Sequence, residues 1–259
     1  AISFPQKLLG LERLNFHLFF KFVVHASTFN SKEALENSIY LLGYSHKISH
    51  YIPNGVNLSR FQPAHKKLLE TPVVLLLPAR IISQKNQLGL IDAVALLLKR
   101  NSHFFGKIKI QFVGAIGDID YWEKVQQKIS EMKLESCFEY LGERKDITPY
   151  YHNAHAVILP SLHEGFPNVL LEAWACAKPV LVSDEADTAN LLTKGHGGIK
   201  FPADSTEQMA DAIESFICLS SDQKQYQGKI GYQIIKKHYQ FSKIAEAYAQ
   251  LYYNLLEQK

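Results

Sequence analysis

Residues 156–184, AVILPSLHEGFPNVLLEAWACAKPVLVSD, decide how this chain folds. The first four of them form a short apolar run without alternation, which is typical of a parallel strand buried on both faces. Pro160 and Gly165 break the run into a loop, and Pro167 suits the first turn of a helix, where its missing N–H costs nothing. A second apolar run at 180–182 returns to the sheet. The stretch therefore predicts a strand, a loop, a helix and a second strand.

The loop and the helix start within this stretch have the chemistry of a ligand site. Open α/β sheets bind phosphates where a glycine-bearing loop leads from a strand end into a helix N-terminus. Glu164 lies in the loop and Glu172 in the second turn of the helix, with the free N–H groups around residues 166–169 between them. This arrangement suits a molecule with hydroxyls at both ends and a diphosphate in the middle, such as a sugar nucleotide. Taken alone, the two glutamates are better explained as solvated loop and helix charges.

The segment EGFPNVLLE, with the following AWACAKPVLVSD, resembles the E-x7-E signature of retaining glycosyltransferases with the GT-B fold, the "glycosyl transferases group 1" family. The resemblance implies that Glu172 holds the nucleotide ribose and that Glu164 contacts the donor sugar. It also implies that backbone groups of the loop and helix start receive sugar and phosphate oxygens. The residues concerned are Gly165, Phe166, Pro167, Asn168 and Val169.

Two basic residues follow an earlier apolar run at 73–77, which predicts another buried strand. Arg80 and Lys85 come just beyond this strand and before a helix-forming segment. In the family that the chain resembles, an arginine and a lysine here bind the donor pyrophosphate and stabilise the leaving nucleotide. Without the resemblance, two exposed basic residues on a loop are the simpler interpretation.

Two further loops follow strands predicted at 108–113 and 138–141. Gly114 ends the first strand, and a glycine there lets the backbone approach a ligand, although this pattern is weak on its own. Glu143 lies in the loop after the second strand. The resemblance implies that this loop lies against the nucleotide base, largely through backbone groups.

The chain departs from the family's pattern in two places. Residues 185–190, EADTAN, replace a glycine pair and a glutamate that the family commonly shows near the donor sugar, so this loop is assigned no role. Ala177 stands where glycine is frequent. We expect this second change to be mild because helices tolerate alanine well.

The predicted elements indicate an α/β fold. Strands and helices alternate from Val73 onward, which predicts a Rossmann-like, doubly wound parallel sheet. The resemblance identifies this sheet as the C-terminal domain of a GT-B fold. After it, a turn and a short strand are expected at 195–202, and helices are expected at 206–218, 222–238 and 242–257.

The sequence also predicts how the chain divides into domains. Residues 52–57, IPNGVN, resemble the connection between the family's two domains. We therefore expect a remnant of the N-terminal acceptor domain at residues 1–60 and a donor-binding domain with a C-terminal crossover helix at residues 61–259. Within the remnant, a capping-box pattern at 31–36 predicts a helix that ends near Gly43.

Composition limits the partners of this 259-residue chain. It is 47% hydrophobic with a net charge of +3, which fits a globular protein with an acidic partner such as a nucleotide, a phospholipid or a polysaccharide. No dense Lys/Arg run favours nucleic acid, and no Cys or His pattern predicts a disulfide framework or a metal site. No apolar run approaches the roughly 20 residues that span a bilayer. We expect a cytoplasmic protein, with any peripheral membrane contact made through the missing N-terminal half.

The function implied by the resemblance is retaining, metal-independent transfer of a sugar, of hexosyltransferase type, as in polysaccharide biosynthesis. The donor is a nucleotide sugar and the acceptor a glycan or lipid-linked sugar. Only about 50 residues precede the interdomain connection, fewer than the roughly 100–150 of a typical domain, so we expect an inactive C-terminal fragment. One alternative is a non-catalytic nucleotide-sugar-binding module. Another, a glycosidase that uses Glu164 and Glu172, explains neither Arg80 nor Lys85 and is less favoured.

Overall fold

The chain forms two compact units in its structure, a computed structural model that describes residues 24–42, 45–64, 68–192 and 197–257. One unit comprises Ala1–Gly55 and Phe241–Lys259, and the other comprises Val56–Gln240. The last helix therefore belongs to the same unit as the N-terminal segment. The domains expected at residues 1–60 and 61–259 stay a prediction.

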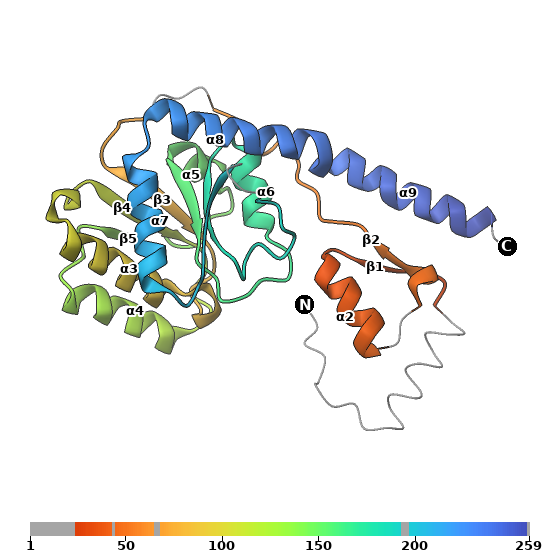
Figure 1. Ribbon diagram of the computed structural model, residues 1–259, viewed down its shortest axis with the longest axis horizontal. Helices are drawn as coiled ribbons and strands as arrows, with labels where there is room; N and C mark the ends of the chain where they lie inside the picture. Colours follow the sequence, from red (N-terminus) through yellow and green to blue (C-terminus); the bar gives the residue numbers. More distant parts are fainter. Residues whose placement is uncertain (1–23, 43–44, 65–67, 193–196, 258–259) are drawn as a thin grey trace. The chain divides into compact units, whose positions relative to one another are not determined.

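The larger unit is built on a six-stranded parallel sheet with the strand order β5-β4-β3-β6-β7-β8 (Figure 1). All residues of β6 and β7 are buried, as expected for strands that are covered on both faces. The predicted α/β fold with a doubly wound parallel sheet is thus confirmed. The strands are β3 (Val73–Pro78), β4 (Ile108–Val113), β5 (Phe138–Tyr140), β6 (Ala156–Leu159), β7 (Val180–Ser183) and β8 (Gly198–Phe201).

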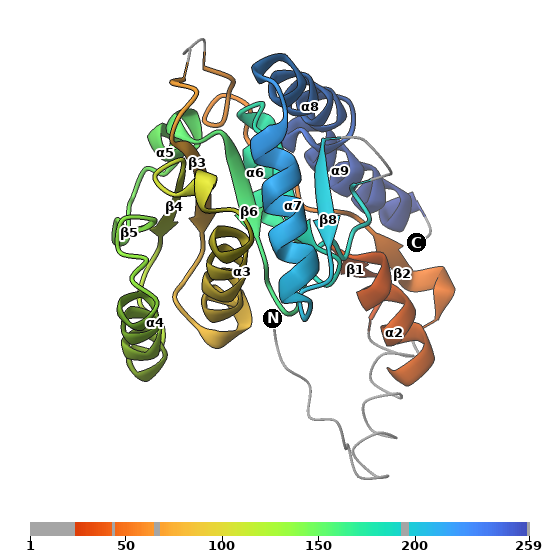
Figure 2. The same cartoon turned by 60° about the vertical axis from the view of Figure 1, so that its left-hand side comes forward.

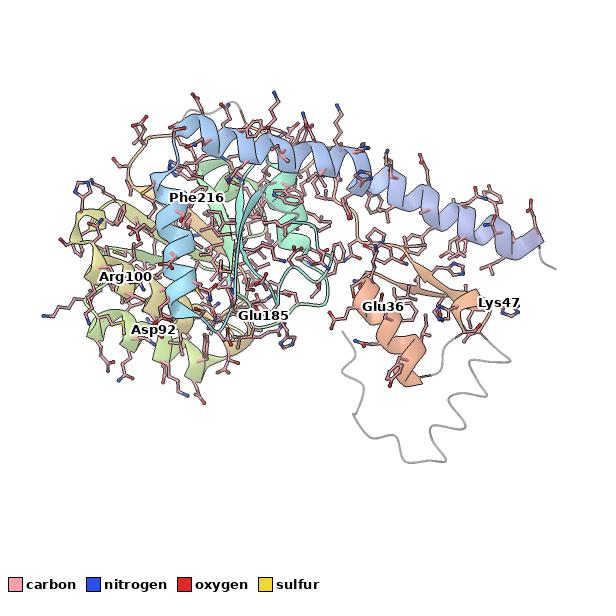
Figure 3. All side chains as sticks on the ribbon, in the orientation of Figure 1. Glu36, Lys47, Asp92, Arg100, Glu185 and Phe216 are labelled. Atoms are coloured by element: carbon pink, nitrogen blue, oxygen red, sulfur yellow. The ribbon has the colours of Figure 1, made fainter. Side chains whose placement is uncertain are left out.

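Helices cover this sheet because each crossover between parallel strands must return along one of its faces. Helix α3 packs against α4 and α7, and α6 packs against α8. Ion pairs of Asp92 with Lys128 and of Arg100 with Asp211 join α3 to its two neighbours (Figure 3). The helices are α3 (Gln87–Arg100), α4 (Ile119–Glu131), α5 (Thr148–Asn153), α6 (Asn168–Ala175), α7 (Thr206–Cys218) and α8 (Ser221–Ile234), which a π-helical turn, Ile235–Tyr239, extends.

The end of α6 is packed closely against its surroundings. Trp174 is fully buried, and a Cβ added at Gly231 on α8 would lie 2.3 Å from its Cδ1. A Cβ at Gly228 would lie 1.9 Å from the carbonyl oxygen of Ala177. Only glycine therefore lets α8 approach α6 at these two positions.

The expectation for Ala177 is wrong in its physical reason. Helix α6 ends at Ala175, so Ala177 lies beyond the helix, and it has a φ of +55°. This is the left-handed conformation in which helices commonly end and in which glycine is preferred, because a Cβ is strained there. Alanine's tolerance inside helices does not apply to this position.

The smaller unit contains two parallel strands, β1 (Ser27–Phe29) and β2 (Ser49–Tyr51), with helix α2 (Lys32–Leu42) between them in sequence (Figure 2). The predicted helix start is confirmed, because the hydroxyl oxygen of Ser31 accepts a hydrogen bond from the backbone N–H of Ala34 at 3.1 Å. The predicted helix end at Gly43 lies outside the described residues. Helix α9 (Phe241–Glu257) completes the unit and matches the last predicted helix.

Candidate functional site

The larger unit has a switch point in its sheet between β3 and β6. From β3 the chain winds outward through β4 and β5, and from β6 it winds outward on the other side through β7 and β8. The loops that follow β3 and β6 therefore lead away from each other toward different helices. In open α/β sheets, ligands bind outside the carboxyl ends of the strands at such a point. The predicted residues Arg80 and Lys85 lie in the first of these loops, and Glu164 lies in the second.

The two loops are joined by three polar contacts. The backbone N–H of Leu162 donates to the carbonyl of Gln84 at 2.9 Å, and the side-chain amide of Gln84 donates to the carbonyl of His163 at 2.9 Å. Next to them, Lys85 and Glu164 form a hydrogen-bonded ion pair. Their side chains are only 15% and 13% exposed, so water screens this pair weakly. The structure thus brings together Lys85, which the family resemblance assigns to the donor pyrophosphate, and Glu164, which it assigns to the donor sugar.

Arg80 lies at the same edge of the sheet. Its residue is exposed, and its guanidinium makes no ion pair with any described residue. The fully buried Gln87 donates its side-chain amide to the carbonyl of Arg80 at 3.0 Å, which fixes the backbone from which the arginine extends. The backbone of Arg80 is therefore held in place, while its positive charge is paired with no carboxylate of the described residues.

Gly114 is required by a neighbouring loop. It has a φ of +154°, and a Cβ there would lie 2.2 Å from the carbonyl oxygen of Ala79, in the loop that carries Arg80. Its N–H donates to the carbonyl of Gly142 at 3.0 Å. Gly114 therefore packs the loops after β3, β4 and β5 against one another, and its contact with a ligand stays a prediction. Glu143, next to Gly142, is exposed, and its role likewise stays a prediction.

The predicted loop before α6 is braced by the segment that departs from the family pattern. Phe166 and Pro167 are buried, Pro167 is the N-cap residue of α6, and the helix itself begins at Asn168. Gly165 is exposed, and its carbonyl accepts a hydrogen bond from the hydroxyl of Thr188 at 3.1 Å. Residues 185–190, which were assigned no role from the sequence, thus contact the loop that carries Glu164.

The segment that braces this loop is itself anchored by buried charge. Asp187 is buried and accepts hydrogen bonds from the N–H groups of Leu191 and Leu192 at 2.8 and 3.1 Å. Lys200 on β8 lies 3.3 Å from the same carboxylate. The neighbouring Glu185 accepts a hydrogen bond from the N–H of Ala203 at 2.9 Å (Figure 3). These hydrogen bonds and this ion pair tie residues 185–190 to the chain that follows them.

Glu172 lies in the second turn of α6, as predicted, and is held by a residue that the sequence did not single out. The phenol of the fully buried Tyr151 donates a hydrogen bond to Glu172 Oε2 at 2.7 Å. Burial raises the pKa of the Glu172 carboxyl, while this hydrogen bond and the positive charge of Arg60 oppose the rise. Burial and the charge of Glu172 raise the pKa of Tyr151 well above its ordinary value, so the phenol remains a donor.

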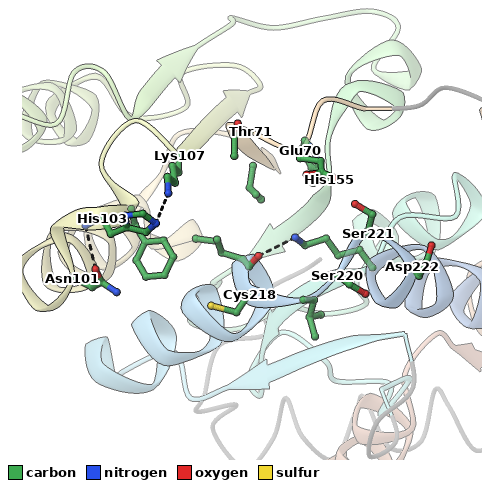
Figure 4. A pocket seen from close by; sticks show the side chains of 15 residues that line it. Glu70, Thr71, Asn101, His103, Lys107, His155, Cys218, Ser220, Ser221 and Asp222 are labelled. Atoms are coloured by element: carbon green, nitrogen blue, oxygen red, sulfur yellow. Dashed lines mark hydrogen bonds between the residues drawn. The ribbon is translucent and has the colours of Figure 1, made fainter.

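A hollow of about 830 Å³ lies at the other, amino edge of the sheet (Figure 4). It lies beside Val73, the first residue of β3, and beside the start of α8. In its wall Lys107 contacts His103, and the ammonium of Lys224 donates to the carbonyl of Ile217 at 3.0 Å. None of the predicted site residues lines this hollow. This hollow and the predicted site residues are therefore at different edges of the sheet.

Three further observations concern possible metal ligands, the Cys176 thiol and membrane-spanning helices in the described part of the chain. No three of their His, Cys, Asp or Glu side chains gather as a metal site requires, and metal independence of the reaction stays a prediction. Burial raises the pKa of the Cys176 thiol to about 12, so it stays protonated at neutral pH. No helix in the described part of the chain is long and apolar enough to cross a bilayer.

The family model described as "Glycosyl transferases group 1" matches residues 72–218, which is more than half of the chain. The chain therefore belongs to this family, and the family named by the sequence resemblance is confirmed. The match covers β3 to α7 and so contains both loops at the switch point. It does not test the E-x7-E roles of Glu164 and Glu172, which stay predictions.

Individual relatives agree with this assignment. N,N'-diacetylbacillosaminyl-diphospho-undecaprenol alpha-1,3-N-acetylgalactosaminyltransferase of Campylobacter jejuni is 29% identical over 182 residues, 66% of this chain and 44% of the relative. The chain spans 44–59% of the length of the first curated relatives that it matches.

Solved structures show the same fold. Anabaena HepE in complex with UDP and glucose is similar with a TM-score of 0.82 at 21% identity, over 98% of this chain and 70% of HepE. The C-terminal domain of the group 1 protein LpcC from Francisella tularensis matches with a TM-score of 0.63 at 22% identity, over 72% of this chain and all of that domain. The predicted likeness to the C-terminal domain of a GT-B fold is thus confirmed.

Proposed function

We propose that this chain is the donor-binding part of a retaining glycosyltransferase, which transfers a sugar from a nucleotide sugar to a glycan or lipid-linked acceptor. The observation that carries the proposal is the meeting of Lys85 and Glu164 at the switch point of the sheet. Family membership supports glycosyl transfer as the reaction. The UDP and glucose named for the HepE structure support a nucleotide sugar as the donor.

In this proposal the donor exchanges the partners of the Lys85–Glu164 pair. A diphosphate offers Lys85 charged acceptor oxygens, and hydrogen bonds between ionised groups are among the strongest in proteins. Glu164, released from Lys85, accepts hydrogen bonds from hydroxyls of the donor sugar. The ion pair thus holds both side chains near their working positions and at the same time competes with the ligand.

Negative charge develops on the nucleoside diphosphate as the bond to the sugar breaks. Lys85 and the uncompensated Arg80 stabilise this charge from the β3 side. The N–H of Asn168, which the sequence predicted to be free, instead donates to the carbonyl of Phe166 at 3.0 Å. The backbone N–H of Val169, at the start of α6, faces the developing charge with the positive end of the helix dipole. Fixed donors of this kind, aimed at developing charge, are a large contribution to catalysis.

The remaining donor groups are assigned to the nucleoside. Glu172 accepts hydrogen bonds from the ribose hydroxyls, and the backbone of the loop that contains Gly142 and Glu143 lies against the base. Two arrangements support this assignment. Glu172 already has a fixed hydrogen-bond donor on one oxygen, and Arg60 joins the base loop to the Glu172 region by donating to the carbonyl of Lys145 at 3.3 Å.

The acceptor and the compartment complete the proposal. The Campylobacter relative is named for an undecaprenol-diphosphate acceptor, which supports a lipid-linked acceptor here. We place the reaction in the cytoplasm, without a metal ion. We place the acceptor-binding groups outside this chain, which spans 44–59% of the length of the first curated relatives that it matches. It follows that this chain alone binds donor but does not transfer sugar.

The proposal is tested by calorimetric titration of the chain with UDP, UDP-glucose and uridine, and by an assay for sugar transfer to a lipid-linked acceptor. Arg80→Ala should weaken UDP binding about tenfold, because it removes one charged contact of roughly 1.5 kcal/mol, and should leave uridine binding unchanged. Lys99→Ala, which removes an exposed charge from the far end of α3, is the matched control. Equal losses for UDP and uridine would argue against a phosphate site at Arg80. Transfer by this chain alone would contradict the placement of the acceptor groups.

A further inference from the structure

A buried phenol stands beside the carboxylate to which the proposed function assigns the ribose. Tyr151 lies on α5 and is fully buried, and its O–H donates to Glu172 Oε2 at 2.7 Å. Its ring packs edge-on against Phe61, with the ring centroids 5.8 Å apart. Packing therefore fixes the ring, and the fixed ring in turn directs its hydroxyl at one oxygen of Glu172.

We infer that Tyr151 is a positioning residue of the nucleotide site, which holds Glu172 in the rotamer and the ionised form that accept hydrogen bonds from a ribose diol. The inference rests on the proposed function of Glu172. A carboxylate has about four acceptor positions, and Tyr151 uses one of them. Among the described residues nothing donates to Oε1, so enough acceptor positions remain for two adjacent hydroxyls.

The first contribution of Tyr151 is to fix the orientation of Glu172. A glutamate has three rotatable side-chain bonds. A ligand that immobilises such a side chain binds less tightly, because the loss of side-chain conformational freedom costs free energy. For one long side chain this loss corresponds to about two- to tenfold in the dissociation constant. The hydrogen bond from Tyr151 orders Glu172 before the nucleotide arrives, so the ligand does not have to.

The second contribution is to keep Glu172 ionised. Three groups face it: Tyr151 from α5, Arg60 from the segment before β3, and Cys176, the C-cap residue of α6. The Cys176 thiol stays neutral because burial raises its pKa to about 12. Burial raises the pKa of Glu172, and only the Tyr151 hydrogen bond and the Arg60 charge oppose it. Without the Tyr151 hydroxyl the pKa of Glu172 rises further. Ribose binding should then be lost at a higher pH as the solution is acidified.

The experiment compares one pair of ligands on each protein. UDP and 2′,3′-dideoxy-UDP are titrated into the whole 259-residue chain, its Tyr151→Phe variant and its Tyr150→Phe variant, at pH 8 and pH 6. If UDP does not bind the wild type, ADP or GDP with its dideoxy counterpart replaces the pair. Tyr150 is the matched control, because it lies next to Tyr151 on α5 and its hydroxyl bonds to no described residue. The ratio of the two affinities on one protein is independent of any change in the folded fraction.

The expected result is that Tyr151→Phe weakens UDP about two- to tenfold at pH 8 and more at pH 6, and leaves dideoxy-UDP unchanged. Tyr150→Phe should behave like the wild type. The inference is overturned if Tyr151→Phe keeps the wild-type ratio, or if it loses both ligands equally, since the hydroxyl then serves packing alone. A wild type that binds both ligands equally well, or binds neither, would instead overturn the ribose role of Glu172 and this inference with it.

Discussion

The two edges of the central sheet differ in how their charged side chains are paired. The amino edge has a hollow of about 830 Å³, and Lys224 in its wall donates to a backbone carbonyl and forms no ion pair with a carboxylate of the described residues. The carboxyl edge has opposite charges on two loops that meet at the switch point, with Lys85 and Glu164 in contact. Imperfect packing between helix ends is enough to produce a hollow. Opposite charges that are held together, with a free arginine beside them, require specific residues on several elements.

The loops of the carboxyl edge also depend on one another. Gln84 fixes the loop that carries Glu164 by two hydrogen bonds, and Thr188 fixes it again at Gly165. Such bracing limits how far a binding group has to reorganise when a ligand arrives. We therefore expect substitutions at the carboxyl edge to change nucleotide affinity, and substitutions at the amino edge to change stability alone.

The largest expected effect comes from removing a lysine at each edge. Lys85→Ala should weaken UDP binding about ten- to a hundredfold, because it removes a charge-assisted contact of roughly 1.5–3 kcal/mol and leaves Glu164 unpaired opposite the phosphates. Lys224→Ala, at the amino edge, should leave UDP affinity unchanged. Calorimetric titration of both variants with UDP and uridine measures the difference. A loss of UDP affinity in Lys224→Ala as large as that in Lys85→Ala would erase the distinction between the edges.

The sequence predicted the parts of this site but not how they meet. The strands were recognisable because their apolar runs are short and unalternating, and the loops because proline and glycine interrupt those runs. The meeting of Lys85 with Glu164, 79 positions apart, depends on β6 lying next to β3, and no local pattern contains strand order. Tyr151 was missed for the same reason, since nothing in its local sequence relates it to Glu172. Gln84 acts partly through its backbone, which residue type does not reveal.

A smaller effect separates the two glutamates within the carboxyl edge. Glu172→Gln should weaken UDP and UDP-glucose alike, by about tenfold, because a neutral amide accepts ribose hydroxyls less strongly than a carboxylate does. Glu164→Gln should weaken UDP-glucose relative to UDP and tighten UDP itself by about fivefold, because it removes the charge that competes with the diphosphate for Lys85. Glutamine keeps the volume of the side chain, so packing changes little.

The measurement for the two glutamates is a titration of each variant with both ligands. If Glu164→Gln weakens UDP as strongly as Glu172→Gln does, the ion pair serves the structure of the loops and does not compete with the donor. If both variants bind both ligands like the wild type, neither glutamate belongs to the site. In that case a loss of UDP affinity in Lys85→Ala would indicate a nucleotide site that does not use the glutamates, and an unchanged affinity would indicate no nucleotide site here.

The smallest expected effect is on stability, at the end of α6 that lies away from the switch point. Ala177 has a φ of +55°, where a Cβ costs roughly 1–2 kcal/mol and glycine nothing. Glycine also has more freedom in the unfolded chain, which offsets part of this gain, so Ala177→Gly should raise the free energy of unfolding by about 1 kcal/mol. Ala247→Gly is the opposed control, because Ala247 is exposed within α9 and glycine there should lower that free energy by about 0.5–1 kcal/mol. Urea denaturation measures the change in the free energy of unfolding, which should be positive for Ala177→Gly and negative for Ala247→Gly. Titration of Ala177→Gly with UDP should give the wild-type affinity. Destabilisation by Ala177→Gly would mean that its methyl group packs more favourably than its backbone is strained, and a change in UDP affinity would show that this end of α6 is coupled to the loops at the other.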